Sequence, residues 1–147
     1  MVKNNELHNQ TNSIMEGYNI AFKVQEKTLA GRTQDDLTIS AVTKDSITKD
    51  DKGNTNSAVT GHDISFRAAG LMDEAKGEDG KLGRDEIIEL SLLTGDAAKL
   101  PFVYGAEGGT MYKGTAVITG YSESTNAQGE ATYTVDFKVS GAMTKVA

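Results

Sequence analysis

The stretch "ATYTVDFKVSG", residues 131–141, carries the clearest strand pattern in the chain. Apolar residues fall on every second position, with a threonine, an aspartate and a lysine between them. Successive side chains of a strand point to opposite faces, so this alternation predicts a strand with one buried and one exposed face. The residues predicted to form the buried face are Tyr133, Val135, Phe137 and Val139.

Other segments repeat this pattern. Alternation indicates half-buried strands in "YNIAFKV" (18–24), "DLTISAVT" (36–43) and "HDISFRA" (62–68). The segment "GTAVITGY" (114–121) is apolar on both faces, which is typical of a central strand covered on both sides. A further short strand is predicted at "LPFVYG" (100–105). In the segment 36–43 the residues predicted to face the core are Leu37, Ile39 and Ala41.

One segment has a different period. "RDEIIELSLLT", residues 84–94, spaces its apolar residues three and four positions apart, which predicts an amphipathic helix ended by Gly95. The predicted fold class is therefore mainly β: a β-sandwich or barrel of about six strands or more with one flanking α-helix at about residues 84–94. The residues assigned to the buried helix face are Ile87, Ile88, Leu90 and Leu92.

Length and composition narrow the possible classes of protein. A chain of 147 residues suits one domain, expected at residues 15–147 after a polar, flexible arm at residues 1–14. The absence of cysteine argues against disulfides and thiolate chemistry. A net charge of -6 argues against binding through nucleic-acid phosphates or to an anionic membrane. The N-terminus has no apolar signal-peptide core, so the protein is expected to be cytoplasmic when made.

An acidic motif raises the question of calcium. "EDGKLGRDEIIEL", residues 78–90, resembles the second half of an EF-hand loop, with Gly80 at position 6 and Glu86 at position 12. Positions 1 and 3 would be Ala75 and Gly77, which have no side-chain oxygen. A turn leading into the acidic start of a helix explains the same residues without a metal. We therefore expect no calcium site and no cofactor.

Residues typical of catalysis are scarce. The chain has two histidines, His8 and His62, and no nucleophile-elbow motif. The paired carboxylates fall in predicted turns or at the start of the helix, and the glycine-rich segment 105–110 precedes a strand, as a hairpin connection does. A hydrolase with two carboxylates is a less favoured alternative, because such groups meet only in the folded protein. The sequence predicts a protein that is not an enzyme.

Charge and polarity single out two segments. Residues 73–89 hold seven acidic and three basic residues, a net -4 of the total -6. Residues 44–61, "KDSITKDDKGNTNSAVTG", are too polar for a core and are predicted to form a long loop. A connection of this length in a compact domain is usually functional or disordered.

Four segments together resemble one family. They are "KTLAGRTQDDLTISAVTKDSITKDD" (27–51), "TGHDISFRAAGLM" (60–72), "YKGTAVITGYS" (112–122) and "YTVDFKVSGAM" (133–143). In their order and spacing they resemble the major tail proteins, or tail tube proteins, of long-tailed bacteriophages. The resemblance covers about residues 17–145.

The resemblance implies a β-sandwich closing toward a barrel, six copies in a ring, and rings stacked into the tail tube. Strands of neighbouring copies would join around the lumen, and DNA would pass through it without specific binding. The expected partners are further copies of the chain and other tail proteins, with no membrane. The expected location is the virion, after assembly in the cytoplasm of the bacterial host. The long loop would reach an adjacent ring, and its candidate self-assembly residues are Lys44, Asp45, Ser46, Lys49, Asp50, Asp51 and Lys52.

Two alternatives remain at this point. The first is the inner tube of a contractile injection or type VI secretion system, which the same resemblance covers. The second is a β-sandwich adhesin or binding module, which aromatic residues clustered in loops would favour. The loop at residues 44–61 contains no aromatic residue, so the tail tube interpretation is preferred.

Overall fold

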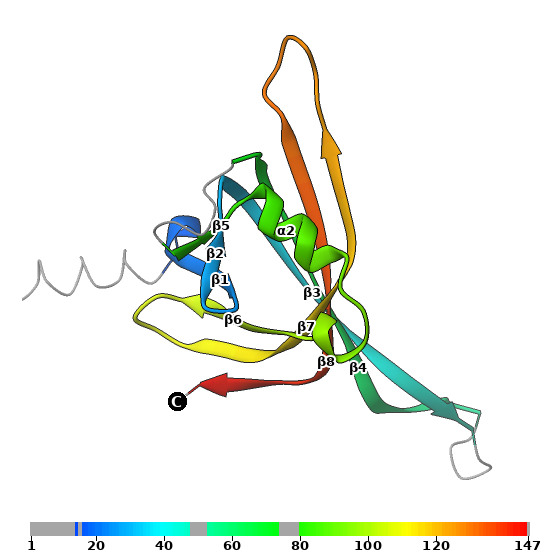
Figure 1. Cartoon of the computed structure of the whole chain (residues 1–147). Helices are drawn as coiled ribbons and strands as arrows, with labels where there is room; N and C mark the ends of the chain where they lie inside the picture. Colours follow the sequence, from blue (N-terminus) through cyan, green and yellow to red (C-terminus); the bar gives the residue numbers. More distant parts are fainter. Residues whose placement is uncertain (1–13, 15, 48–52, 74–79, 147) are drawn as a thin grey trace, which may run out of the picture.

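The alternating segments form one sheet in the computed structural model, which describes residues 14, 16–47, 53–73 and 80–146 (Figure 1). The sheet has eight strands in the order β3-β4-β8-β7-β6-β1-β2-β5. Every neighbouring pair is antiparallel except β2 and β5. The strands are β1 (Ile20–Val24), β2 (Lys27–Leu29), β3 (Arg32–Ser46), β4 (Asn56–Leu71), β5 (Lys81–Leu82), β6 (Leu100–Ala106), β7 (Met111–Ser124) and β8 (Thr132–Val146).

The sheet folds over on itself and encloses an aromatic core. Phe22 of β1 stacks on Phe66 of β4 at 4.9 Å between ring centroids, although these strands are far apart in the sheet order. Phe22 also lies 5.2 Å from Phe137 of β8, and Phe66 lies 5.1 Å from Phe102 of β6. One half of the sheet, β3-β4-β8-β7, therefore packs against the other half. The predicted mainly β fold with one flanking helix is confirmed.

Strand β8, which contains most of the stretch 131–141, lies at the centre of this core. All four of its predicted inward residues are buried. The prediction for β3 was wrong in part: Leu37 packs on the core, but Ile39 is 53% exposed and Ala41 is exposed. The reason is that β3 and β4 continue past the body. Pairing between β4 and β8 ends at Ser65 and Lys138, so the residues beyond are not covered by the other layer.

Strand β7 is central, as predicted, and pairs with both β6 and β8. Of the predicted central segment only Ala116 is buried, so the expected cover on both faces is incomplete. Val117 is the cross-strand partner of the exposed Lys138, which places it on the face turned away from the core. Its burial is intermediate because no second layer packs on that face within the described residues.

The one α-helix of the described residues, α2 (Arg84–Ser91), is shorter than the predicted helix. It begins after the N-cap Gly83, and Ile87 is its buried residue. Leu92 is the C-cap and is 76% exposed, so its assignment to the buried face was wrong. A helix of about two turns cannot present a long stripe, and Leu92 already lies past its end. Gly95 begins a 3-10 helix, Gly95–Ala98, and does not end α2.

The helix orientation gives a first prediction. Ile87→Ala should lower the free energy of unfolding by roughly 2 kcal/mol, because it removes buried methyl groups and leaves a cavity under the helix. Leu92→Ala should change it by less than about 0.5 kcal/mol, because that side chain is already in solvent. Urea unfolding of both variants measures the difference. Equal losses in the two variants would mean that the helix docks by another face.

Charged side chains hold α2 on β7. The Arg84 guanidinium donates to the Glu123 carboxylate, with Nε 2.7 Å from Oε1, and the Tyr121 hydroxyl donates to the same oxygen at 2.8 Å. These two donors lower the pKa of Glu123 below its ordinary value. Burial and the neighbouring carboxylate raise the pKa of Tyr121. The contact joins the start of α2 to the end of β7, 39 residues apart in the sequence.

The lowered pKa of Glu123 predicts a pH-dependent contribution to stability. A carboxylate with a depressed folded-state pKa stabilises the fold above its ordinary pKa, here 4.5, and loses that contribution as the pH falls through the folded-state value. Glu123→Gln should therefore unfold at lower urea concentration than the wild type at neutral pH. The gap should shrink well below pH 4.5. A gap of the same size at both pH values would contradict this role.

Candidate assembly surfaces

Strands β3 and β4 extend from the sandwich as a two-stranded arm, defined here as residues 39–46 and 56–64 (Figure 1). Their pairing continues out to Ser46 and Asn56. The predicted loop at residues 44–61 was therefore too long, and the connection between the strands is residues 47–55. The polarity of the segment indicated its exposure correctly. Two exposed strands can still form backbone hydrogen bonds with each other, so a polar segment can remain a strand.

The candidate assembly residues divide into two groups. Lys44, Asp45 and Ser46 lie in β3 on the arm, and all three are exposed. The other four, Lys49, Asp50, Asp51 and Lys52, lie outside the described residues. The structure therefore places the first group on a projecting strand. Their role in assembly stays a prediction.

The arm also exposes apolar side chains that the sequence pattern did not single out. Val42 is 43% exposed, Val59 is 58% exposed, and Ile47, directly after β3, is 63% exposed. Val59 is the cross-strand partner of Thr43 and therefore lies on the face opposite to that of Val42, so both faces of the arm expose an apolar side chain. The arm is thus both charged and apolar, a combination that suits contact with another protein.

Four long strand edges of the described residues have no strand partner, and one of them is the β6 side of β7 over residues 117–124, past the last pair with β6. The outer edge of β3 is a second, because β3 pairs with β4 alone. The other two are the edges of β4 and β8 that faced each other while these strands were paired. Beyond their last pair the two strands diverge, which leaves β4 unpaired on this side over residues 56–64 and β8 over residues 139–146. Unpaired edges carry free N–H and C=O groups that can pair with another chain. These edges are candidate sites for strand pairing between copies.

A side chain closes the seam between β1 and β3. The Arg32 guanidinium donates hydrogen bonds to the backbone carbonyls of Phe22, at 3.1 Å, and Ile20, at 3.2 Å. It also forms an ion pair with Asp35 at 3.1 Å. Sequence reasoning missed Arg32, because its acceptors are backbone atoms ten and twelve residues away. Arg32 thereby attaches the first residues of β3 to β1.

Asp35 points inward from this edge strand. Its cross-strand partner is the fully buried Ala68, and its Oδ1 is buried without a hydrogen-bond partner among the described residues. Burial raises the pKa of Asp35, although the adjacent Arg32 opposes the shift. An inward-pointing charge on an edge strand disfavours indiscriminate pairing with other edges. The base of β3 is thus protected, whereas the arm beyond it is open.

The face of β3, β4, β8 and β7 turned away from the core, called the polar face, carries short polar and charged side chains. Asp36 and Arg67 are cross-strand partners, and Arg67 Nε lies 2.8 Å from Asp136 Oδ1. A shallow hollow of about 620 Å³ follows this row, and its other charged lining residues are Asp63 and Lys138. Three acidic residues against two basic ones make the polar face nearly neutral.

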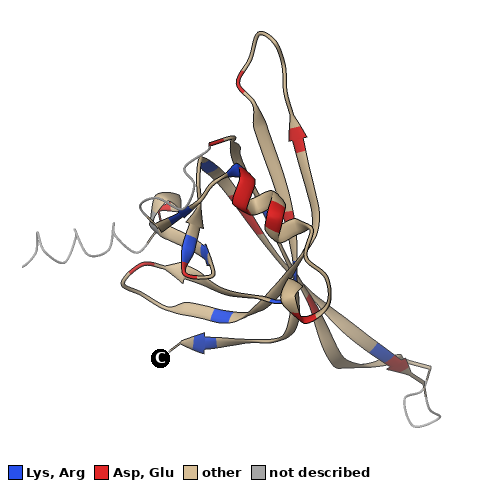
Figure 2. Cartoon of the chain, viewed as in Figure 1, with Lys and Arg blue, Asp and Glu red and all other residues tan. Residues whose placement is uncertain are grey.

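The described acidic residues of α2 lie elsewhere. Figure 2 shows acidic residues coloured red on α2, which packs on the core side of β7 and so lies away from the polar face. Glu86 of α2 is 4.0 Å from Lys27. Residues Ala75 and Gly77 of the calcium motif lie outside the described residues. Across the described residues, no group of three or more His, Cys, Asp or Glu is placed to hold a metal ion. No described helix is long and apolar enough to cross a bilayer.

The described residues form a sandwich with an aromatic core, one short α-helix, open strand edges and a projecting arm. A family model described as phage tail tube protein matches residues 20–145. The chain belongs to the phage tail tube protein family. The match includes α2 and every described strand except the last residue of β8, and so it includes both the arm and the polar face. No curated protein sequence matches the chain.

Several solved structures have a fold similar to that of this chain. The tail of an empty gene transfer agent particle, solved with C6 symmetry, matches with a TM-score of 0.73 and 19% identity over 91% of this chain and 100% of that one. A chain of the sheath–tube complex of an extracellular contractile injection system, in its extended state, matches with a TM-score of 0.67 and 12% identity over 96% of this chain and 97% of that one. The SPP1 tail tube matches with a TM-score of 0.65 and 13% identity, covering 90% and 78%.

Family membership confirms the resemblance inferred from the four sequence segments. This membership identifies the protein as a structural component of a phage tail, as predicted. The likeness to the contractile injection system extends to the fold alone at 12% identity. The family match therefore favours the phage tail over that alternative.

Proposed function

We propose that six copies of the protein form a ring and that rings stack into the tail tube of a phage virion. The observation that carries this proposal is the tail tube family match over residues 20–145. The six-fold symmetry of the gene transfer agent tail, whose subunit shares the fold, supports the number of copies. The unpaired edges of β3, β4 and β8 supply the surfaces that neighbouring copies would pair.

The polar face is the surface that we assign to the lumen. It lies opposite the layer that carries α2, and its charge is nearly balanced. A lumen without a basic stripe does not hold phosphates, so DNA could pass through without specific binding. Hydroxyl side chains of Thr38, Ser65 and Thr119 also line this face and keep it wettable. In this arrangement α2 faces outward.

The proposal assigns no catalytic role, cofactor or membrane contact to the chain. Its partners would be further copies of itself and other tail proteins at the ends of the tube. Assembly would take place in the host cytoplasm, and the final location would be the virion. The arm would contact a copy in an adjacent ring, as the resemblance implied for the segment that contains Lys44 and Asp45.

Electron microscopy of the purified protein tests the proposal. Negative-stain images at rising protein concentration should show six-fold rings and then tubes, and native mass spectrometry should detect the hexamer. A monodisperse monomer at every concentration would contradict the proposal. That result would favour the β-sandwich binding module instead.

A further inference from the structure

A pocket of about 610 Å³ opens at the seam between β1 and β3. Within the described residues no strand pairing joins these two strands, and the Arg32 guanidinium crosses the seam instead. The 3-10 helix Gly17–Asn19, the first residue of β1 and Tyr104 of β6 supply the other walls. Four consecutive residues of β3, from Arg32 to Asp35, line the pocket, so it lies along the free edge of that strand.

Asp35 is buried in this pocket with only one of its two oxygens satisfied. Its side chain is 14% exposed, and Oδ2 lies 3.1 Å from the Arg32 guanidinium. Oδ1 is buried without a hydrogen-bond partner among the described residues. A buried carboxylate oxygen that accepts no hydrogen bond is costly, because it has lost water and gained no donor. The folded monomer therefore holds this charge at a cost in stability.

The groups that surround Asp35 do little to stabilise its charge. Arg32 is its one ion-pair partner within the described residues, and that guanidinium is shared with two backbone carbonyls of β1. The neighbouring Asp36 carboxylate opposes a second negative charge. Strands β1 and β4 present apolar residues there, Ile20 and Ala68. The phenol groups that line the pocket or lie close to the carboxylate are Tyr18, Tyr104 and Tyr133.

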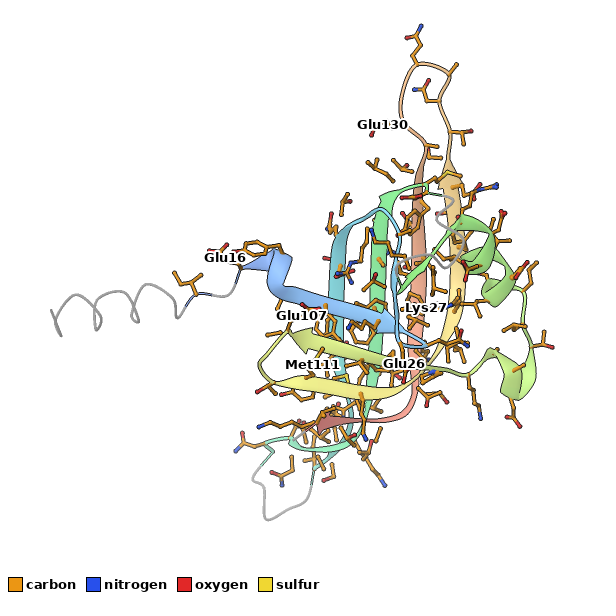
Figure 3. All side chains as sticks on the ribbon, turned by 60° about the vertical axis from the view of Figure 1, so that its left-hand side comes forward. Glu16, Glu26, Lys27, Glu107, Met111 and Glu130 are labelled. Carbon is orange, nitrogen blue, oxygen red and sulfur yellow. The ribbon has the colours of Figure 1, made fainter. Side chains whose placement is uncertain are left out.

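Two further carboxylates lie near the pocket but outside it. Glu16 and Glu107, which Figure 3 shows near the start of β1, are exposed and do not line the pocket. Burial raises the pKa of Asp35, Arg32 opposes this shift, and Asp36 adds to it. The geometry and the charges agree that Asp35 accepts a proton more readily than an exposed aspartate does.

Assembly would change the surroundings of Asp35. In the proposed ring a strand of a neighbouring copy covers the free edge of β3, and paired strands lie about 5 Å apart. Such a strand would exclude water from the mouth of the pocket and remove the remaining exposure of Asp35. Arg32 is already in contact with Oδ2 and could offer no new contact. A carboxylate that loses its last water without gaining a donor is more stable when protonated.

We infer that Asp35 takes up a proton from solvent when a neighbouring copy covers the edge of β3, so that tube assembly is linked to pH. This inference rests on the proposed function and adds a control on it. Where Asp35 is ionised, each copy must bind a proton or bury the charge before its edge can be covered. Because the assembled state binds more protons than the free state, tubes should form at a lower protein concentration as the pH falls.

Asp35→Asn tests the linkage in the full-length protein, because asparagine has the shape of the protonated side chain and carries no charge. At neutral pH the variant should form tubes at about a tenfold lower concentration than the wild type, the change that one pKa unit produces. The ratio between the two concentrations should fall toward one as the pH falls. Light scattering and negative-stain microscopy between about pH 8 and pH 5 measure assembly.

Asp36→Asn is the matched control for the loss of one negative charge. It changes the next residue of β3, whose exposed carboxylate accepts a hydrogen bond from Gln34 on the polar face. General repulsion between acidic copies also weakens as the pH falls, and this control includes that effect. Asp36→Asn should keep the pH dependence of the wild type, whereas Asp35→Asn should lose part of it.

The proton itself can be measured during assembly. In weakly buffered solution the pH should rise as wild-type or Asp36→Asn tubes form, and it should rise less with Asp35→Asn. Equal proton uptake in all three proteins would overturn the inference. Weaker assembly of Asp35→Asn would also overturn it, because a neighbouring copy would then donate a hydrogen bond to the carboxylate. Wild-type protein that never assembles would contradict the proposed function, and the linkage with it.

The monomer gives a readout that does not depend on assembly. A carboxyl group with a raised folded-state pKa weakens the fold at high pH, and the penalty disappears as the pH falls through that value toward the ordinary value of 3.8. Asp35→Asn should therefore unfold at higher urea concentration than the wild type at neutral pH, with a gap that closes toward pH 3.8. A variant less stable than the wild type at neutral pH would show that the charge stabilises the seam, and it would overturn the inference.

Discussion

Removal of the arm should abolish tube formation and leave a folded monomer. The variant replaces residues 41–62 with an Asn-Gly turn, so that Ser40 and Asp63, which are already cross-strand partners, close a two-residue hairpin. The described residues that are removed are exposed, apart from Gly61, and none belongs to the aromatic core. The loss of stability should therefore be small, whereas the proposed contact with a neighbouring copy would be lost entirely.

Thermal unfolding and negative-stain microscopy measure the two effects separately. A second variant, with residues 47–55 replaced by a Gly-Ser linker of equal length, keeps both strands of the arm and changes only their connection. If the strands carry the contact, this variant should retain more assembly than the arm deletion. Tubes formed by the arm deletion at the wild-type concentration would refute the role of the arm. An unfolded monomer would show that the arm belongs to the folding core.

Phe22→Ala should destabilise the fold more than Ile87→Ala does. Phe22 is 1% exposed, and its ring contacts Phe66, Phe102, Tyr104 and Phe137, which join both halves of the sheet. Truncation of a buried phenylalanine costs about 3–5 kcal/mol, through lost burial and the cavity that remains. Because a domain is stable by only about 5–15 kcal/mol, the variant should be marginally folded.

Tyr18 provides the matched control for this substitution. It lies four residues earlier and is 85% exposed, so Tyr18→Ala removes an aromatic ring of similar size without opening a core cavity. It should change the free energy of unfolding by less than about 0.5 kcal/mol. Chemical denaturation of both variants gives the comparison. Similar losses for the two variants would mean that the two halves of the sheet do not meet at Phe22.

The sequence predicted the inner residues of the body well and the limits of the elements less well. Alternation identified Phe66, Val135 and Phe137 correctly, because period 2 reports which side chains share a face. The same pattern failed at Ile39, since alternation does not reveal whether another layer covers that face. Leu92 failed for a related reason: spacing alone does not show where a short helix ends.

The assembly surfaces were harder to predict than the fold. Polarity marked the segment containing Lys44 as exposed, but it gave no sign that the strand continues through it. Arg32 donates hydrogen bonds to backbone carbonyls, and the type of residue that carries a carbonyl does not reveal such a contact. The hollow on the polar face unites Asp36, Arg67 and Asp136, which are far apart in the sequence. Only the fold brings such residues together.

The position of the arm outside the core also affects how the family can evolve. Apart from Ile64, which packs against the core, substitutions on residues 39–46 and 56–64 meet little selection from folding, since these residues contribute little to the buried interior. Under the proposed function, they are constrained mainly by the surface of the neighbouring copy that the arm would contact. Arm and receiving surface should therefore covary between related phages while the core stays constant. Tube subunits from two such phages would then fold alike and yet fail to mix in one tail.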